Sequence, residues 1–336
     1  MNLFGGPSLW GVDIGSGSIK AVRVRASRRG IQLLNAAIYE FPEEGALSEG
    51  LRALFGPSLG QVHSAVQYSG KNPPVVRYLS VPLMPAKELT EAVRWEARKV
   101  ISFPIEDAVV DFLVMGKSED GEAQHFQILM VIVEKAALLG QVRILKEAGL
   151  AVEAVDVAPL ALLNTLRLAP FGQFPGSLLY VDIGAQKMEI NILKGGVLHF
   201  NRQLAMGGDE ITRALSQSLG VPFSEAEQRK RDEGMAEGSA LRATIQGAVD
   251  RFIVEIQRSI DYYRAQSREP GIGKIALMGG TPLMAGFVQY FSGFFDAPVE
   301  LLDPFAAMIS QDPGLVMVRR MAPRFSLAAG LALRKQ

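Results

Sequence analysis

Val-Asp-Ile-Gly occurs twice in this sequence, at residues 12–15 and 181–184, and this repeat limits the possible folds more than any other feature. The copies are about half of the 336-residue chain apart. In each copy an apolar run ends in this pattern, a polar turn follows, and two further apolar runs come after the turn. A period of this length is not that of a solenoid. It predicts two related α/β halves that face each other, each with an aspartate at the end of its first strand.

The strands predicted around the two copies follow the same order. The first copy predicts strands over 10–14, 20–25 and 32–40, and the second predicts a strand that ends at 183, then 189–193 and 197–204. Further along, the pattern predicts a long amphipathic helix over 240–266, a buried strand over 274–278 and a short strand over 298–302. An apolar helix is predicted over 324–334 and is expected to dock on the first half.

Between the two copies lies a block with a different pattern. It predicts a helix over 84–103, strands over 109–115 and 126–133, a helix over 134–148 and a strand over 152–157. This α-β-β-α-β order predicts an insertion subdomain over 83–155. The first half is then 1–82, joined by 156–176 and the C-terminal helix 324–336, and the second half is 177–323.

Composition narrows the possible functions. Lysine plus arginine and aspartate plus glutamate are 35 each, so nothing in the overall charge favours a nucleic-acid partner. The sequence has no cysteine, which excludes disulfides, zinc–cysteine sites and a thiol nucleophile. No stretch is long and apolar enough to predict a membrane span or a leader peptide. We therefore expect a soluble, cytoplasmic protein that does not insert directly into a membrane.

The turn after the first strand has the residues of a phosphate site. Glycines allow backbone N–H groups to approach an anion, hydroxyls add donors, and a lysine supplies positive charge. Asp13 repels phosphate, so its presence is explained if a magnesium ion lies between them. The residues are Gly15, Ser16, Gly17, Ser18 and Lys20. The alternative is an ordinary hairpin with a polar turn.

Two later segments strengthen the first interpretation. Asp182, followed by Gly184 and Ala185, would present a second carboxylate from the opposite half. Gly279, Gly280 and Thr281 follow the strand over 274–278, where a nucleoside can lie against backbone and a helix N-terminus would add positive charge. Read alone, this last segment is also compatible with a tight strand-to-helix turn.

The order of these motifs resembles the actin, heat-shock chaperone and sugar-kinase ATPase superfamily, with its actin-like (ribonuclease H-like) fold. Within it, the chain is most similar to the PilM family of type IV pilus assembly, which is related to FtsA. The resemblance covers most of the chain and includes Asp-x-Gly-Ser-Gly-x-x-Lys at 13–20 and the segments 83–115, 131–166, 224–231, 275–305 and 328–334. It implies two duplicated α/β halves with an FtsA-like insertion.

The resemblance also implies roles for individual residues. The first phosphate turn would hold ATP or ADP, Asp13 and Asp182 would organise Mg²⁺, and Gly184, Ala185 and Gly208 would line the phosphate side. Glu227 and Lys230 would approach the ribose or adenine, and Gly279, Gly280 and Thr281 would cradle the nucleoside.

Two departures from the family pattern bear on hydrolysis. The second turn reads Gln186-Lys187-Met188 where the family usually has a hydroxyl. No residue clearly orients a hydrolytic water, and the nearest candidate is Asp156. A polar residue at a strand-to-helix junction is at least as good an explanation of Asp156. We expect nucleotide binding with weak or no turnover, at most a slow ATPase.

The resemblance implies a cytoplasmic scaffold of the pilus platform. Such a scaffold would bind the N-terminal cytoplasmic peptide of a PilN-like membrane protein, contact other platform components, and lie at the inner membrane through its partner. Two alternatives stay open, a small-molecule kinase of the sugar type and a filament-forming actin homologue. A related type II secretion machine could also be the host.

Overall fold

The computed structural model describes residues 9–42, 47–120, 123–169, 171, 174–267, 271–310 and 315–335. The predicted segments 1–82, 156–176 and 324–336 extend beyond these ranges, so residues 1–8, 43–46, 170, 172–173 and 336 of those predictions lie outside the described residues. The chain divides into two compact units, one formed by residues 1–67 with 149–336 and the other by residues 68–148.

The larger unit contains two five-stranded sheets with the same topology. The first has the order β3-β2-β1-β4-β8 and the second the order β11-β10-β9-β12-β13. In each sheet the first three strands pair antiparallel and the remaining strands pair parallel. The sequence repeat therefore corresponds to a duplicated sheet, as predicted.

The strands lie close to their predicted positions, except β4, for which no strand was predicted. The first sheet is built from β1 (Trp10–Ile14), β2 (Ser18–Ser27), β3 (Gly30–Glu40), β4 (His63–Gln67) and β8 (Ala151–Asp156). The second sheet is built from β9 (Ser177–Ile183), β10 (Met188–Lys194), β11 (Val197–Leu204), β12 (Lys274–Met278) and β13 (Val299–Leu301).

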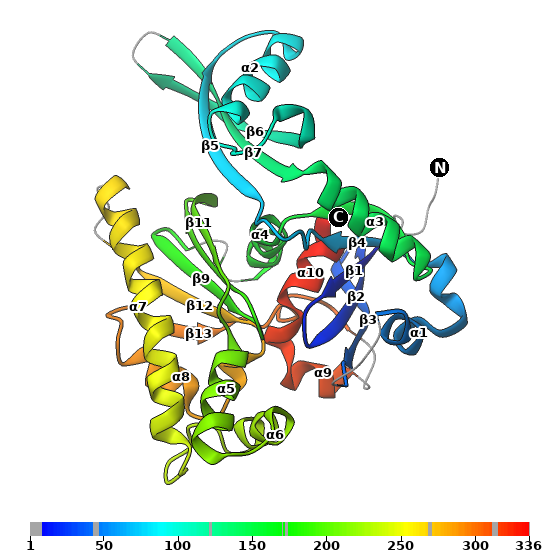
Figure 1. The fold of residues 1–336 in the computed structure, drawn as a ribbon. Coiled ribbons are helices and arrows are strands. Elements are labelled where there is room, and N and C mark those ends of the chain that lie inside the picture. The colour runs from blue at the N-terminus through cyan, green and yellow to red at the C-terminus, as the bar shows by residue number, and fades with distance from the viewer. Residues whose placement is uncertain are drawn as a thin grey trace. The chain divides into compact units, whose positions relative to one another are not determined.

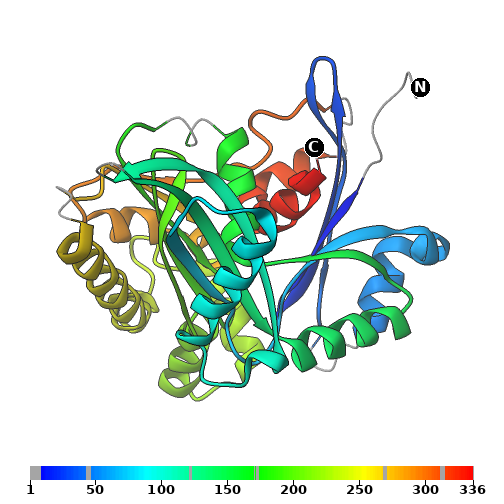
Figure 2. The ribbon, with the colours of Figure 1, turned by 90° about the horizontal axis from the view of Figure 1, so that it is seen from above.

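Two helices lie side by side between these sheets, α4 (Ala158–Leu168) and α10 (Ser326–Ala332) (Figures 1 and 2). Helix α10 packs on β1 and β2, and α4 reaches the second sheet, where the Tyr180 hydroxyl donates to Pro159 O at 3.1 Å. A β-carbon at Gly11 would lie 1.9 Å from Ala328 O, so only glycine permits this approach of strand and helix. The predicted C-terminal helix therefore docks on the first half.

The apolar core of the second sheet is built against three helices. Side chains of β9 and β10 pack against α5 (Gly208–Leu219), α7 (Arg242–Ser267) and α8 (Phe287–Ser292). Helix α6 (Phe223–Glu233) packs against α5, and α1 (Leu47–Phe55) and α9 (Val316–Arg320) complete the unit.

The smaller unit is a three-stranded sheet with two helices. Strands β5 (Val75–Pro82), β7 (Ala123–Glu134) and β6 (Ala108–Asp120) pair antiparallel in the order β5-β7-β6. Helix α2 (Ala86–Arg98) buries Leu89, Val93 and Ala97 against this sheet, and α3 (Lys135–Glu147) follows β7.

The boundaries of the smaller unit differ from those predicted. The unit begins at 68 rather than 83, because β5 pairs with β7, and it ends at 148 rather than 155, because β8 pairs with β4 of the first sheet. Its order is therefore β-α-β-β-α. Helix α2 also ends at Arg98, so Val100 lies beyond the helix and is exposed.

No helix in the part of the chain that the structure describes is long and apolar enough to cross a membrane.

Candidate functional site

The first turn brings Asp13, Gly15 and Lys20 together. Asp13 and Lys20 face each other across β1 and β2, and Lys20 Nζ lies 3.1 Å from Asp13 Oδ2, with both side chains largely buried. The N–H of Gly15 donates to Ser18 O at 3.0 Å and closes the turn. A β-carbon at Gly15 would lie 3.1 Å from Lys20 Nζ, so the glycine backbone lies against the ammonium group. Ser16 and Gly17 are exposed, whereas Ser18 is buried.

The second copy folds into the same kind of turn. Gly184 N–H donates to Lys187 O at 2.9 Å, which is the contact that Gly15 makes in the first copy. A β-carbon at Gly17 would lie 3.8 Å from that of Ala185, so the two turns face each other closely. Gln186 and Lys187 are both exposed. The repeat in the sequence thus becomes a pair of opposed turns.

The carboxylates that precede the two turns act on each other. Burial first, and then the charge of Asp13, raise the pKa of Asp182 to about 7, while the charge of Lys20 works in the opposite direction and Glu189 adds to the increase. Glu189 lies opposite Asp182 in the β9–β10 pair, and burial raises its pKa too, although hydrogen bonds from Gln203 and Asn201 oppose the change. Two carboxylates from different halves therefore meet at one place.

This arrangement fits a hard cation. A divalent ion bound by Asp13 and Asp182 would remove the repulsion that raises the pKa of Asp182. Within the described residues, no group of three or more histidine, cysteine, aspartate or glutamate side chains could hold a metal. Phosphate oxygens and water would have to complete the coordination of such an ion, which is the way magnesium is usually bound beside a nucleotide.

The N-terminus of α5 is bonded to the second turn. Gly208 N–H donates to Gly184 O at 2.9 Å, and Asp209 N–H donates to Ala185 O at 2.8 Å. A β-carbon at Gly207 would lie 2.6 Å from Ala185 O, so a larger residue there would push the helix away. Gly208 lies beside the second turn, and its N–H is already used as a donor. Its place on the phosphate side of a nucleotide stays a prediction.

The glycine pair after β12 packs directly on the same turn. A β-carbon at Gly279, whose φ is +88°, would lie 2.5 Å from Asp182 Oδ1, and the Thr281 hydroxyl donates to Gly184 O at 3.0 Å. The predicted helix N-terminus is not at this place. A 3₁₀ turn spans Thr281–Leu283, and α8 begins only at Phe287, so Gly279 and Gly280 receive no helix-terminal charge.

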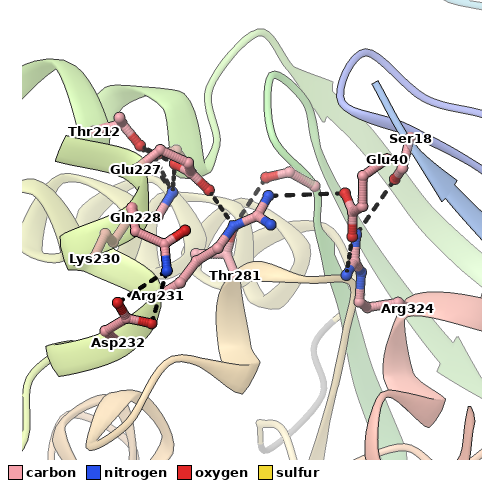
Figure 3. A network of polar contacts seen from close by, with 12 residues as sticks. Ser18, Glu40, Thr212, Glu227, Gln228, Lys230, Arg231, Asp232, Thr281 and Arg324 are labelled. Atoms are coloured by element: carbon pink, nitrogen blue, oxygen red, sulfur yellow. Dashed lines mark hydrogen bonds and ion pairs between the residues drawn. The ribbon is translucent and has the colours of Figure 1, made fainter. Parts of the chain in front are cut away.

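Glu227 and Lys230 on α6 hold α5 and α6 together. Lys230 Nζ donates to Thr212 Oγ1 at 2.8 Å and to Gly208 O at 3.2 Å, and lies 2.5 Å from Glu227 Oε2 (Figure 3). Burial lowers the pKa of Lys230 despite its acidic neighbours. Burial also opposes ionisation of Glu227, but Lys230, Thr212 and Arg231 outweigh it and lower the pKa of Glu227.

Asp156 has both carboxylate oxygens engaged. Oδ2 lies 2.5 Å from Nη1 of Arg334, and Oδ1 accepts from Val157 N–H at 2.8 Å. These contacts tie the end of β8 to the C-terminal segment and correspond to the junction role weighed from the sequence. They give no support to the predicted catalytic role, which stays a prediction.

Three charged residues that the sequence did not single out join this region. Glu40 ends β3, Arg231 belongs to α6 and Arg324 precedes α10, and the Glu40 carboxylate lies between the two guanidinium groups (Figure 3). The sequence carries no signal for these contacts, because their partners are far apart along the chain.

The chain is similar to a known family and to a solved structure of type IV pilus assembly. The family model for the type IV pilus assembly protein PilM matches residues 11–336. A solved structure of a PilM–PilN type IV pilus biogenesis complex is similar over 97% of this chain and 98% of that chain, with 27% identity and a TM-score of 0.80.

More distant structures share the fold. The ethanolamine utilization protein EutJ of Carboxydothermus hydrogenoformans has 16% identity and a TM-score of 0.58, covering 99% of this chain and 91% of that chain. MreB5 of Spiroplasma citri bound to AMPPNP has 10% identity and a TM-score of 0.52, covering 98% and 96%. The actin-like ATPase fold predicted from the sequence is thus confirmed.

Sequence relatives include the cell division protein FtsA. The Neisseria meningitidis protein is 29% identical over 174 residues, which cover 45% of this chain and 41% of FtsA. The Bacillus subtilis protein is 26% identical over 214 residues, which cover 57% of this chain and 48% of FtsA. The matches span less than half the length of these two relatives.

Proposed function

The chain belongs to the family of the type IV pilus assembly protein PilM, and from that membership we propose that it is an ATP-binding scaffold of the inner-membrane pilus assembly platform. It is cytoplasmic in this proposal and lies at the membrane through a partner. The family model over residues 11–336 and the likeness to PilM in the PilM–PilN complex support this proposal.

The observation that carries nucleotide binding is the convergence of Asp13 and Asp182 beside two opposed turns. The pKa of Asp182 rises to about 7 because burial and the Asp13 charge both disfavour its ionisation. Gly17 keeps a side chain out of the space between the turns, and the backbones of Gly207 and Gly279 lie directly against the second turn. The related MreB5 fold with AMPPNP adds support, although its identity is only 10%.

In this proposal Asp13 and Asp182 hold Mg²⁺, and the first turn holds the phosphates. The ion, when bound, neutralises part of the phosphate charge. Lys20 keeps Asp13 oriented and supplies a further positive charge at 3.1 Å. The backbone of Gly279, Gly280 and Thr281 lies against the nucleoside, while Glu227 and Lys230, which hold α6 to α5, approach the ribose or adenine.

We propose weak or no hydrolysis. The carboxylate oxygens of Asp156 already contact Arg334 and Val157, and the second turn has no hydroxyl side chain at Gln186, Lys187 or Met188. Both features work against positioning an attacking water, as general-base catalysis requires. Holding ATP rather than cleaving it suits a scaffold.

The proposed partner is the N-terminal cytoplasmic tail of a PilN-like membrane protein. An extended tail can add to the edge of a sheet or fill apolar pockets. In the smaller unit β5 and β6 are the edge strands, and β6 exposes Leu113 and Val114. These features support peptide binding by this unit. Other platform components would bind elsewhere.

Nucleotide titration of the full chain tests the proposal. Fluorescent ATP should bind more tightly with Mg²⁺ than without it. Asp13→Asn should lower the affinity for Mg-ATP by about tenfold or more, the cost of losing a charged contact. Asp261→Asn is the control, because it removes a carboxylate charge from an exposed position on α7 and should leave affinity unchanged. Wild-type protein that binds no adenine nucleotide would overturn the proposal.

A second measurement separates the alternatives. The scaffold should retain a synthetic peptide that corresponds to the N-terminal tail of a PilN-like protein, and should release phosphate from ATP slowly or not at all. Rapid phosphorylation of an added sugar would favour the small-molecule kinase instead. Nucleotide-dependent sedimentation would favour the filament-forming alternative.

A further inference from the structure

Arg324 lies between the first phosphate turn and the turn at Gly279–Thr281, which in the proposed function hold the phosphates and the nucleoside. Its Nη2 lies 3.4 Å from Ser18 Oγ in the first phosphate turn. A β-carbon at Gly280 would lie 3.7 Å from its Nε, so the guanidinium group is also beside the proposed nucleoside turn. The side chain is only 16% exposed. A largely buried guanidinium in this place faces the ligand space of the proposed function.

Glu40 already occupies this arginine. Glu40 Oε1 lies 2.6 Å from Arg324 Nη1, and Glu40 Oε2 lies 3.8 Å from Arg231 Nη2 (Figure 3). The residue after Glu40 is bonded to the same turn, since Phe41 N–H donates to Gly17 O at 3.0 Å. The backbone next to Glu40 is therefore anchored beside the first phosphate turn.

The two arginines that contact Glu40 differ in whether they have a second carboxylate partner. Burial disfavours the charge of Arg231, but the hydrogen bond and charge of Glu227 and the charge of Glu40 outweigh it and raise the pKa of Arg231. Arg231 Nε also lies 2.9 Å from Glu227 Oε1, so it keeps a carboxylate partner without Glu40. For Arg324, the further contacts are Ser18 and, at 3.9 Å, the sulfur of Met321, both uncharged.

We propose that Arg324 binds the polyphosphate of the nucleotide and that Glu40 is a built-in competitor for it. In the protein without ligand, the Glu40 carboxylate takes the place of a phosphate on the guanidinium group. Phosphate binding requires Arg324 to exchange this partner. The affinity for nucleotide is thereby set lower than the site could reach. This inference rests on the proposed nucleotide binding.

An alternative explanation of the same contacts makes the opposite prediction for Glu40. If the ion pairs only clamped the segments around the cleft, removing either Glu40 or Arg324 would loosen the site and speed ligand release. Competition predicts opposite signs, because a carboxylate beside a polyanion repels it while a guanidinium attracts it. The sign of the Glu40 effect therefore decides between them.

Stopped-flow binding of N-methylanthraniloyl-ATP with Mg²⁺ tests the proposal on the full chain. Glu40→Gln should lower Kd by about threefold to tenfold, because it frees a buried charged donor for the phosphates. Arg324→Gln should raise Kd by about tenfold or more, the loss of a charge-assisted contact. Glu225→Gln and Arg229→Gln are the matched controls, because they break an exposed ion pair on α6 and should leave Kd unchanged.

Arg324→Gln could lose affinity because it destabilises the chain. Glu40→Gln still tests the proposal in that case, because misfolding cannot raise the affinity. Unlabelled adenosine in competition should lose little affinity in Arg324→Gln, since it has no phosphate. If Kd rises or does not change in Glu40→Gln, this inference is wrong. The proposed function still stands in that case if the wild type binds the nucleotide. Absence of binding in every variant would overturn both.

Discussion

A buried carboxylate that also faces another carboxylate is costly to ionise, and at Asp182 this cost opposes folding. The pKa of Asp182 is raised from 3.8 to about 7, so the folded chain holds a proton there that the unfolded chain has lost between these two pH values. Folding stability from this group therefore falls as pH rises through that window, and stays reduced above it. The two carboxylates lower the stability of the protein without ligand, and they supply the negative charge that a cation would bind.

Asp182→Asn should consequently stabilise the protein without ligand. At pH 8 we expect the free energy of unfolding to rise by about 1–3 kcal/mol, below the full linkage value because the side chain is partly exposed. At pH 4 the variant and the wild type should differ little, because Asp182 is then protonated. Urea unfolding without Mg²⁺ at both pH values measures this. Equal stability of the two proteins at pH 8 would contradict the raised pKa of Asp182.

At the scale of single residues, the sequence predicted which side chains converge but not how they are paired. Asp13, Lys20, Asp182 and the glycines stand within two short segments and their repeat, so local pattern was enough to find them. Glu40 and Arg324 were missed because their partner lies almost the whole chain away, and an ion pair leaves no local pattern.

Among the elements, α10 shows how strongly backbone approach depends on glycine. A β-carbon at Gly330 would lie 1.8 Å from Ala161 O of α4, and the Thr165 hydroxyl donates to Ser326 O at 2.7 Å beside it. Two helices in such close contact leave no room for a methyl group. The C-terminal helix is therefore held by shape as well as by apolar burial.

Gly330→Ala should cost about 3 kcal/mol or more of unfolding free energy, because α10 and α4 must separate to admit the methyl group. Gly247→Ala is the matched control. Gly247 is exposed within α7 and no atom would lie within 4 Å of its β-carbon, so alanine there should add up to about 1 kcal/mol. Thermal and urea unfolding compare the two, and a harmless Gly330→Ala would mean that the helices are less tightly packed than described.

Element prediction succeeded where periodicity is strong and failed at boundaries. Strands of the duplicated sheets other than β4, and the helices α2, α3 and α7, follow apolar patterns that are visible in sequence. The smaller unit was placed at 83–155 because β5 was not recognised as its strand, and its partner β7 is about fifty residues further along the chain. The start of α8 was placed too early because a glycine turn looks the same before a 3₁₀ turn as before a helix.

For the whole molecule, two separate compact units imply that a nucleotide affects one of them directly. A ligand stabilises the unit that binds it against opening, in proportion to its concentration relative to Kd. Hydrogen exchange with Mg-ATP should therefore slow in segments 11–20, 182–189 and 207–212, and should change little in 108–117 and 124–134. Protection concentrated in the smaller unit would contradict the proposed site. Adenosine in the same Mg²⁺-containing buffer serves as a control for effects of the phosphates.

The repeat of Val-Asp-Ile-Gly and the apolar periodicity were sufficient for the duplicated sheets and the residues of the two turns, because these depend on short stretches of chain. The family followed from the resemblance of the ordered motifs to a known family. The domain limits, the packing of α10, the engagement of Asp156 with Arg334 and the placement of Glu40 between Arg231 and Arg324 required the folded chain. They arise from contacts between segments distant in sequence, which are formed only when the sheets, helices and turns pack together and bury their shared surfaces.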